Sequence, residues 1–138
     1  MTKPMALQRH PTLDPHRAEA RERMRAGGAE ATARRAAAAA QEKKADDVVL
    51  IDLRAHSSYA DFLVICSGTN ERQLEAIADG VETSLREVGE RPIGTEGVRG
   101  GRWVLLDFGD VVIHVFHQDE RTYYDVEGLW SDAPAQHL

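Results

Sequence analysis

Six side chains that could take part in acid–base or metal chemistry lie within residues 107–120 of one short segment, DFGDVVIHVFHQDERTYYD, residues 107–125. Carboxylates and imidazoles are the common ligands of metal ions and the common acids and bases of enzymes. Their positions on the predicted elements decide whether the segment is an active site or a polar part of the scaffold. The six are Asp107, Asp110, His114, His117, Asp119 and Glu120.

The two histidines do not have the spacing of a chelating pair. The run VVIHVFH predicts a β-strand, and residues three apart on a strand point to opposite faces of the sheet. His114 would share a face with Val112 and Phe116, whereas His117 would share one with Val115 at the end of the strand. A metal would need further ligands converging on a single imidazole, so the pattern favours no metal site.

Asp107 and Asp110 flank Gly109, where two apolar runs are expected to be joined by a turn. An aspartate beside a turn usually accepts hydrogen bonds from neighbouring backbone N–H groups. Acid–base catalysis needs two carboxylates in one pocket whose surroundings separate their pKa values. Nothing in the sequence supplies such a pocket, so the pair is interpreted as structural.

Other chemical motifs are also incomplete. SGTN, residues 67–70, could hold an anion between a strand and a helix, but neither a dinucleotide-binding nor a Walker glycine pattern is present. The next strand lacks the D-x-D pair that holds two metal ions for nucleotidyl transfer. Cys66 lies in an apolar run, where burial raises the pKa of a thiol and makes it unreactive. The sequence therefore predicts no catalytic residue, no cofactor and no metal, and a protein that is not an enzyme.

The elements that carry these residues follow from periodicity. Residues 47–54 and 61–68 predict strands, and the second is apolar on both faces and hence central. Apolar residues at helical spacing predict a helix over 71–88, two apolar runs predict a hairpin over 103–117, and helical spacing returns over 118–130. The remaining tail is expected to be loose. The expected fold class is α/β, a small mixed β-sheet packed with helices.

The first part of the chain differs from the rest in composition. Residues 1–29 are expected to form a flexible or partly helical basic extension, and residues 30–138 the α/β domain. An Ala/Arg-rich helix over 30–44 would open that domain with little to bury. Residues 1–45 contain 10 Lys+Arg and 5 Asp+Glu, whereas residues 46–138 contain 7 and 18, a net charge of −11. An acidic domain repels nucleic acid phosphates and attracts basic surfaces.

Targeting signals are not evident in the chain. No apolar run approaches the roughly 20 residues of a membrane span, and the N-terminus lacks the apolar region of a secretory signal. A single cysteine excludes an internal disulfide. The expected location is the cytoplasm, with no membrane partner.

Aromatic residues gather in the last third of the chain: Trp103, Phe116, Tyr123, Tyr124 and Trp130. They could fill the core, because few large residues occur elsewhere. They could equally form an interface, because tyrosine and tryptophan beside acidic residues are typical of binding hot spots. The sequence leaves both roles open.

Three long blocks resemble the ribosomal silencing factor (RsfS, or Iojap-like) family. They are DLRAHSSYADFLVICSGTNERQLEAIAD, residues 52–79; EGVRGGRWVLLDFGDVVIHVFH, residues 96–117; and RTYYDVEGLWSDAP, residues 121–134. The likeness extends from about Ala36 to Pro134. It implies a fold related in shape to nucleotidyltransferases but without the catalytic acids, in agreement with the missing D-x-D pair.

The resemblance also implies a function without turnover. Family members act as translational repressors that dock on the fourteenth protein of the large ribosomal subunit and block joining of the small subunit, and they often form homodimers. A large-subunit biogenesis factor that uses the same surface is the alternative, and a degenerate nucleotidyltransferase is less favoured. Contact between residues 1–29 and ribosomal RNA is a further expectation.

The matching blocks suggest which residues would touch the ribosomal protein. Charge complementarity would steer docking, and a few desolvated aromatic rings would supply most of the affinity. The expected partner-binding residues are Trp103, His114, Phe116, Tyr124, Leu129 and Trp130, with the acidic residues Asp52, Asp61, Asp107 and Asp110.

Overall fold

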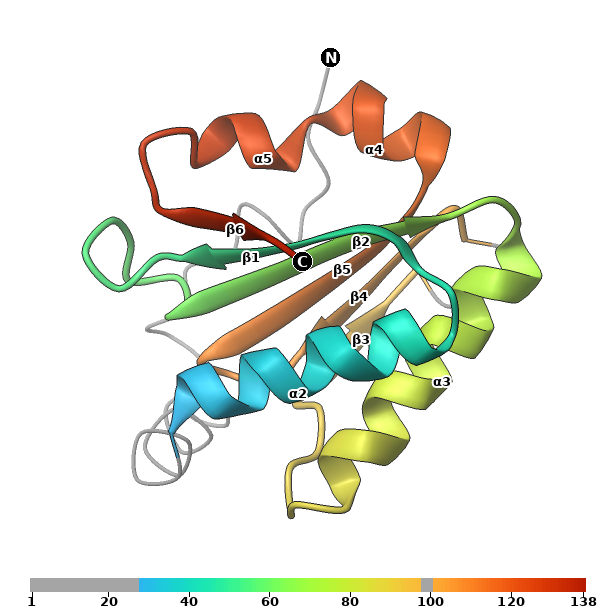
Figure 1. Ribbon diagram of the computed structural model, residues 1–138, viewed down its shortest axis with the longest axis horizontal. Coiled ribbons are helices and arrows are strands. Elements are labelled where there is room, and N and C mark those ends of the chain that lie inside the picture. Colours follow the sequence, from blue (N-terminus) through green and yellow to red (C-terminus); the bar gives the residue numbers. More distant parts are fainter. Residues whose placement is uncertain (1–27, 98–100) are drawn as a thin grey trace.

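A six-stranded mixed sheet lies between two helical layers of unequal size in the computed structural model, which describes residues 28–97 and 101–138 (Figure 1). The strand order is β3-β4-β5-β2-β1-β6. The strands are β1 (Asp46–Asp52), β2 (Phe62–Gly68), β3 (Gly94–Glu96), β4 (Trp103–Asp107), β5 (Val111–His117) and β6 (Ala135–His137). The helices are α2 (Ala29–Glu42), α3 (Glu71–Arg86), α4 (Gln118–Tyr124) and α5 (Val126–Leu129). The expected α/β class is confirmed.

The centre of the sheet is a parallel pair, β2 and β5, whose register runs from Phe62 opposite Val111 to Gly68 opposite His117. The other four strand pairs are antiparallel. A parallel pair needs a long crossover connection, which α3, β3 and β4 supply here. The predicted central strand and the hairpin between β4 and β5 are present, and the short strand β3 lies at one edge of the sheet.

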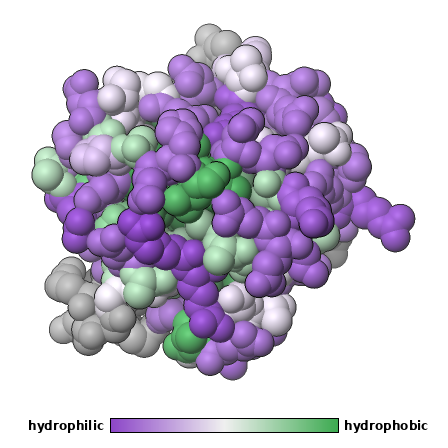
Figure 2. All heavy atoms as spheres, in the orientation of Figure 1, coloured by the Kyte–Doolittle hydropathy of each residue, from purple (hydrophilic) through white to green (hydrophobic). Residues whose placement is uncertain are grey.

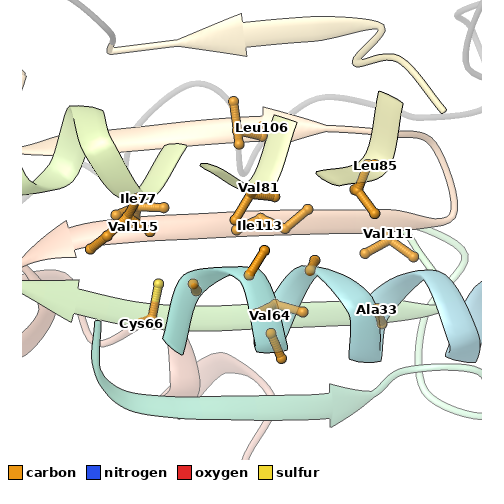
Figure 3. Close-up of a cluster of buried hydrophobic side chains, with 14 of the residues drawn as sticks. Ala33, Val64, Cys66, Ile77, Val81, Leu85, Leu106, Val111, Ile113 and Val115 are labelled. Atoms are coloured by element: carbon orange, nitrogen blue, oxygen red, sulfur yellow. The ribbon is translucent and has the colours of Figure 1, made fainter. Parts of the chain in front are cut away.

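One face of the sheet, the helix-covered face, is packed against α2 and α3 (Figure 1). Its side chains are mostly aliphatic and fully buried, and they interdigitate between the two helices and the strands (Figure 3). The residues labelled there are Ala33, Val64, Cys66, Ile77, Val81, Leu85, Leu106, Val111, Ile113 and Val115.

Helix α2 lies close to its partners, as expected for an alanine-rich helix, but it also contributes to the core, which a helix with little to bury was not expected to anchor. Ala33, Ala36 and Ala40 are completely buried in the cluster of the helix-covered face. Alanine has almost no side chain, so the α2 backbone can approach the sheet and α3 closely. The small residues therefore contribute to the core by close packing.

Helix α3 begins and packs as its sequence predicts. The Asn70 side chain caps it by accepting a hydrogen bond from the Gln73 backbone N–H at 2.8 Å. Its apolar stripe is buried, except that Val88, predicted as the last member, is 51% exposed. The helix ends at Arg86, so Val88 lies beyond the face that the helix presents to the sheet.

The opposite face, here called the aromatic face, carries a second cluster of buried residues from β1, β2, β4 and β5. The thin layer of α4 and α5 covers it (Figure 1). The single helix predicted over 118–130 is wrong, because Asp125 has a left-handed backbone (φ 44°) that separates α4 from α5. The Asp125 carboxylate then caps α5 by accepting a hydrogen bond from the Gly128 N–H at 3.2 Å.

The chain tail was expected to be loose, and this is also wrong. Strand β6 pairs antiparallel with β1, with Ala135 opposite Ile51 and His137 opposite Val49. Leu138 extends the pairing by donating its N–H to the Val48 carbonyl at 2.9 Å. The outer edge of β1 would otherwise present unpaired backbone groups, and the tail satisfies them.

The surface is mostly polar. Figure 2 shows hydrophilic residues over most of one side of the molecule, with hydrophobic residues in small separate patches. None of the helices within residues 28–97 and 101–138 has the length and apolar character that a membrane crossing requires. The expected basic extension over residues 1–29 falls almost wholly outside the described residues.

Candidate functional site

The polar segment that follows the β4–β5 turn does not form a reactive centre. His114 is fully buried on the aromatic face, whereas His117 caps α4, its Nδ1 accepting from the Asp119 N–H and from Arg102, each at 3.1 Å. The predicted divergence of the two imidazoles is confirmed. Among the residues that the structure describes, no group of three or more histidine, cysteine or carboxylate side chains could hold a metal ion.

The two turn aspartates differ in their surroundings. Asp107 accepts a hydrogen bond from the Gly109 N–H at 2.9 Å, as predicted for an aspartate beside a turn. Asp110 is fully buried, and its carbonyl accepts from the N–H groups of Asp61 and Phe62 at 2.8 and 3.0 Å. Asp110 therefore joins the hairpin to the start of β2, and burial keeps its side chain out of direct reach of a docking protein.

The SGTN segment and Cys66 have structural roles. The Gln73 side-chain oxygen accepts from the Thr69 N–H at 2.8 Å, so the loop before α3 is closed by the helix cap. Cys66 lies in the core, and burial raises the pKa of its thiol to about 12. Such a thiol stays protonated and unreactive at neutral pH.

Aromatic rings form the most distinctive group of side chains in the described part of the chain. Trp103 pairs with Phe116 across β4 and β5, and their ring centroids are 4.5 Å apart. Tyr124 of α4 lies 5.0 Å from Trp103 and 4.9 Å from Tyr123. Offset and edge contacts at these distances are favourable for aromatic pairs.

A hydrogen bond between two side chains holds Trp103 in place within this group of rings. The Trp103 indole Nε1–H donates to His114 Nδ1 at 3.1 Å. Burial lowers the pKa of His114 to about 3, so the imidazole is neutral at physiological pH. Indole and imidazole centroids are 5.6 Å apart.

Exposure divides the predicted partner-binding residues into two classes. Trp103, Tyr124 and Trp130 are half-buried, with faces open to solvent, and Leu129 is 48% exposed. The other two members of the apolar set, His114 and Phe116, are fully buried beneath Trp103. The structure therefore gives His114 and Phe116 a supporting position, out of direct reach of a partner.

Tyr123 is an exposed member of the aromatic group that the sequence reasoning did not select. It is 57% exposed, although helical spacing had placed it in a buried stripe with Val126 and Trp130. The break at Asp125 rotates the two halves of the segment relative to each other. A cap-forming residue at this position was the available signal, because aspartate favours helix N-termini over helix interiors.

The four acidic residues lie at the other end of the sheet from Trp103. Asp52 ends β1, Asp107 ends β4, and Asp61 and Asp110 come just before β2 and β5. At about 3.3 Å per strand residue, Asp107 lies roughly 13 Å from Trp103 along β4. The structure brings the acids together at one end, separate from the Trp103 group.

Asp52, a member of that group, has a strong local partner in Arg54. Arg54 Nη2 lies 2.7 Å from its Oδ2, and this hydrogen bond holds the pKa of Asp52 below its usual value. Part of the negative potential at this site is therefore balanced within the chain itself.

Arg121 holds the α4–α5 layer onto the sheet. Its guanidinium forms two hydrogen bonds with Glu127, at 3.0 and 3.1 Å, and donates to the Asp47 carbonyl at 2.7 Å. The side chain is only 12% exposed. One arginine thus links α4, α5 and β1, which fixes the position of the half-open rings.

Comparison with known proteins supports one family. The family model described as "Ribosomal silencing factor during starvation" matches residues 27–138. The ribosomal silencing factor of Halalkalibacterium halodurans is 47% identical over 94 residues, 68% of this chain and 80% of that protein. That of Bacillus subtilis is 46% identical over the same shares. A chloroplastic Iojap protein of Zea mays is 31% identical, over 64% of this chain and 39% of its own.

Solved structures agree with the sequence matches. A crystal structure from Chromobacterium violaceum has a TM-score of 0.72 at 35% identity, covering 74% of this chain and 85% of that one. A second, from Bacillus halodurans, has a TM-score of 0.67 at 43% identity, covering 76% and 95%. The family name denotes silencing of ribosomes. By sequence over most of its length and by fold, this chain belongs to the ribosomal silencing factor family.

Proposed function

We propose that this chain binds the large ribosomal subunit through its fourteenth protein, covers the surface where the small subunit joins, and so represses translation. Family membership supports ribosome-associated silencing. The observation that carries the finer proposal is the aromatic face, where Trp103, Tyr124 and Trp130 pack against the buried cluster and remain partly exposed. Rings that are held in place but only half covered can bury further apolar area on a partner at little cost in ordering.

Charge supports a basic protein as the partner. Residues 46–138 carry 7 Lys+Arg against 18 Asp+Glu, so this part of the chain has a net charge of −11. Such a domain is repelled by ribosomal RNA and attracted to a basic ribosomal protein. Asp61 and Asp107, at the end of the sheet, would direct the approach, while the rings would supply the affinity.

Occupancy of the joining surface is sufficient for this mechanism. A bound protein that overlaps the small subunit prevents joining for as long as it stays bound, so the effect depends on the dissociation rate and not on turnover. This agrees with a structure in which the histidines, the cysteine and the turn aspartates serve packing, capping and turn formation. The proposed location is the cytoplasm, where free subunits meet.

The test is sedimentation of the full chain with separated ribosomal subunits, followed by a subunit-joining assay. We expect co-sedimentation with large subunits, none with small subunits, and fewer joined ribosomes as the protein concentration rises. Trp130→Ala should weaken large-subunit binding by roughly tenfold or more, as expected for a hot-spot tryptophan. Absence of binding to large subunits would refute the proposal, and binding with normal joining would place the docked protein away from the joining surface.

A matched pair of charge changes tests the orientation. Asp107→Asn keeps an oxygen for the Gly109 N–H but removes the charge at the end of the sheet. Glu75→Gln removes the same charge from the exposed side of α3. We expect Asp107→Asn to slow association more than Glu75→Gln at low salt, with the difference disappearing at high salt. Equal effects would mean that the acidic end does not face the partner.

Two further expectations stay predictions. Self-association of the chain would appear as a dimer in analytical ultracentrifugation. Contact of residues 1–29 with ribosomal RNA would give a chain starting at Glu30 a weaker salt dependence of binding than the full chain.

A further inference from the structure

We infer that His114 is the positioning residue for Trp103, holding the indole in the orientation in which it meets the partner. This inference rests on the proposed function, because it assigns Trp103 to the docking surface. His114 itself is fully buried and would touch no partner atom. Its contribution to binding would act entirely through Trp103.

The direction of the hydrogen bond follows from the chemistry of the two rings. An indole N–H can only donate, so His114 Nδ1, 3.1 Å from Trp103 Nε1, must be the unprotonated acceptor. In a neutral imidazole the proton is then on Nε2. Burial lowers the pKa of His114 to about 3, so the ring stays neutral at ordinary pH, and the hydrogen bond from Trp103 favours this tautomer. The contact is therefore a fixed, uncharged acceptor beneath a half-buried tryptophan.

Core stability does not explain a histidine at this position. Residues 111–113 and 115–116 of β5, on either side of His114, are apolar, and neighbours on its face include Val112 and Phe116. His114 Nε2 is buried and has no hydrogen-bond partner among the residues that the structure describes. Burying a polar ring costs free energy that a leucine would not. Within the described part of the chain, the one hydrogen bond of the imidazole side chain is with Trp103.

Stacking alone leaves the indole orientation incompletely determined. Trp103 contacts Phe116 at 4.5 Å and Tyr124 at 5.0 Å between centroids, with interplanar angles of 36° and 44°. Such contacts depend weakly on which edge of the ring faces inward. A directional hydrogen bond selects one edge, so the opposite edge is presented to solvent. A ring already in its bound orientation loses less entropy on docking.

The first experiment observes the hydrogen bond directly in the full-length protein. The indole N–H resonance of Trp103 is assigned by its loss in Trp103→Phe, then compared in His114→Asn and His114→Leu. Asparagine places a carbonyl oxygen near the position of Nδ1, whereas leucine has no acceptor. We expect slow solvent exchange of the indole proton in the wild type and in His114→Asn, and faster exchange with a shifted resonance in His114→Leu. An unchanged indole signal in His114→Leu would overturn the inference.

The second experiment separates positioning from packing by comparing affinity for purified large subunits with thermal stability. His114→Leu removes the hydrogen bond that orients the Trp103 indole before docking. The free energy of one hydrogen bond corresponds to about threefold to tenfold weaker binding. Asparagine is smaller and polar, so His114→Asn should be the less stable variant but the tighter binder. Affinities that follow the order of stabilities would assign His114 a packing role only and overturn the inference.

A double-mutant comparison completes the test. In a Trp103→Phe background, His114→Leu should cause no further loss of affinity, because the group that it positions is gone. The same loss in both backgrounds would overturn the inference. A wild-type chain that does not bind large subunits overturns the proposed function and this inference together. A chain that binds, with a His114→Leu variant that binds equally well, overturns only the role of His114.

Discussion

The helix-covered face and the aromatic face lie on the same strands but bury their side chains in different ways. On the helix-covered face, α2 and α3 enclose aliphatic side chains and alanines, and most of them are fully buried. On the aromatic face, the short helices α4 and α5 leave Tyr123 57% and Leu129 48% exposed, with Trp103, Tyr124 and Trp130 only half covered. Both faces have a closed core, and the aromatic face in addition carries partly exposed aromatic rings.

Two adjacent residues of strand β5 illustrate the difference between the two faces. Ile113 points into the helix-covered face and His114 into the aromatic face, and both are completely buried. The isoleucine belongs to the hydrophobic cluster of the helix-covered face, whereas the histidine accepts a hydrogen bond from the partly exposed Trp103. From this comparison we expect the helix-covered face to contribute mainly to folding stability and the aromatic face to carry the proposed binding.

The largest expected effect tests whether the helix-covered face contributes to folding stability and not to binding. Ile113→Ala removes buried carbons from a site enclosed by α3 and the sheet, and large-to-small changes of this kind cost about 3–4 kcal/mol. Urea unfolding should show that loss, while the folded fraction binds large subunits with unchanged affinity. A loss below about 1 kcal/mol, or weaker binding by the folded fraction, would contradict the division between the faces.

The next effect concerns pH and the aromatic face. The pKa of His114 falls from 6.5 to about 3 on folding, so between these values the unfolded chain binds a proton that the folded chain does not. Stability therefore rises with pH through this window, and lowering the pH from 7 to 5 should remove about 2 kcal/mol. Urea midpoints measured at both pH values should differ less in His114→Leu. An equal pH dependence in that variant would show that other groups are responsible.

Elements with local, regular patterns could be predicted from the sequence. The apolar stripe of α3, the alternation of β1 and the glycine turn between β4 and β5 depend on neighbours in the chain, and each is present in the structure. The misses depend on tertiary contacts. Strand β6 forms because β1 offers a free edge, and the buried role of Ala36 in α2 depends on how closely the sheet and α3 approach.

Prediction of the candidate site was also limited by features that depend on tertiary contacts. Strand alternation correctly places His114 and Phe116 on one face, but it does not reveal that this face is covered at their positions. The cover comes from α4 and from Trp103, and its geometry depends on the left-handed Asp125 and on the Arg121 contacts. The sequence was sufficient to identify the aromatic residues. Which of them are buried and which are exposed could be seen only in the folded structure.

The smallest expected effect compares two exposed apolar residues associated with opposite faces. Leu129 of α5 is 48% exposed and Val88, just after α3, is 51% exposed, so each alanine variant should change folding stability by less than about 0.5 kcal/mol. In binding to large subunits, Leu129→Ala should cost about 1 kcal/mol, roughly fivefold, and Val88→Ala nothing measurable. Because the pair matches in exposure and character, a difference in affinity must come from location. Equal losses would mean that the partner reaches both faces, and the contrast between a face for stability and a face for binding would no longer hold.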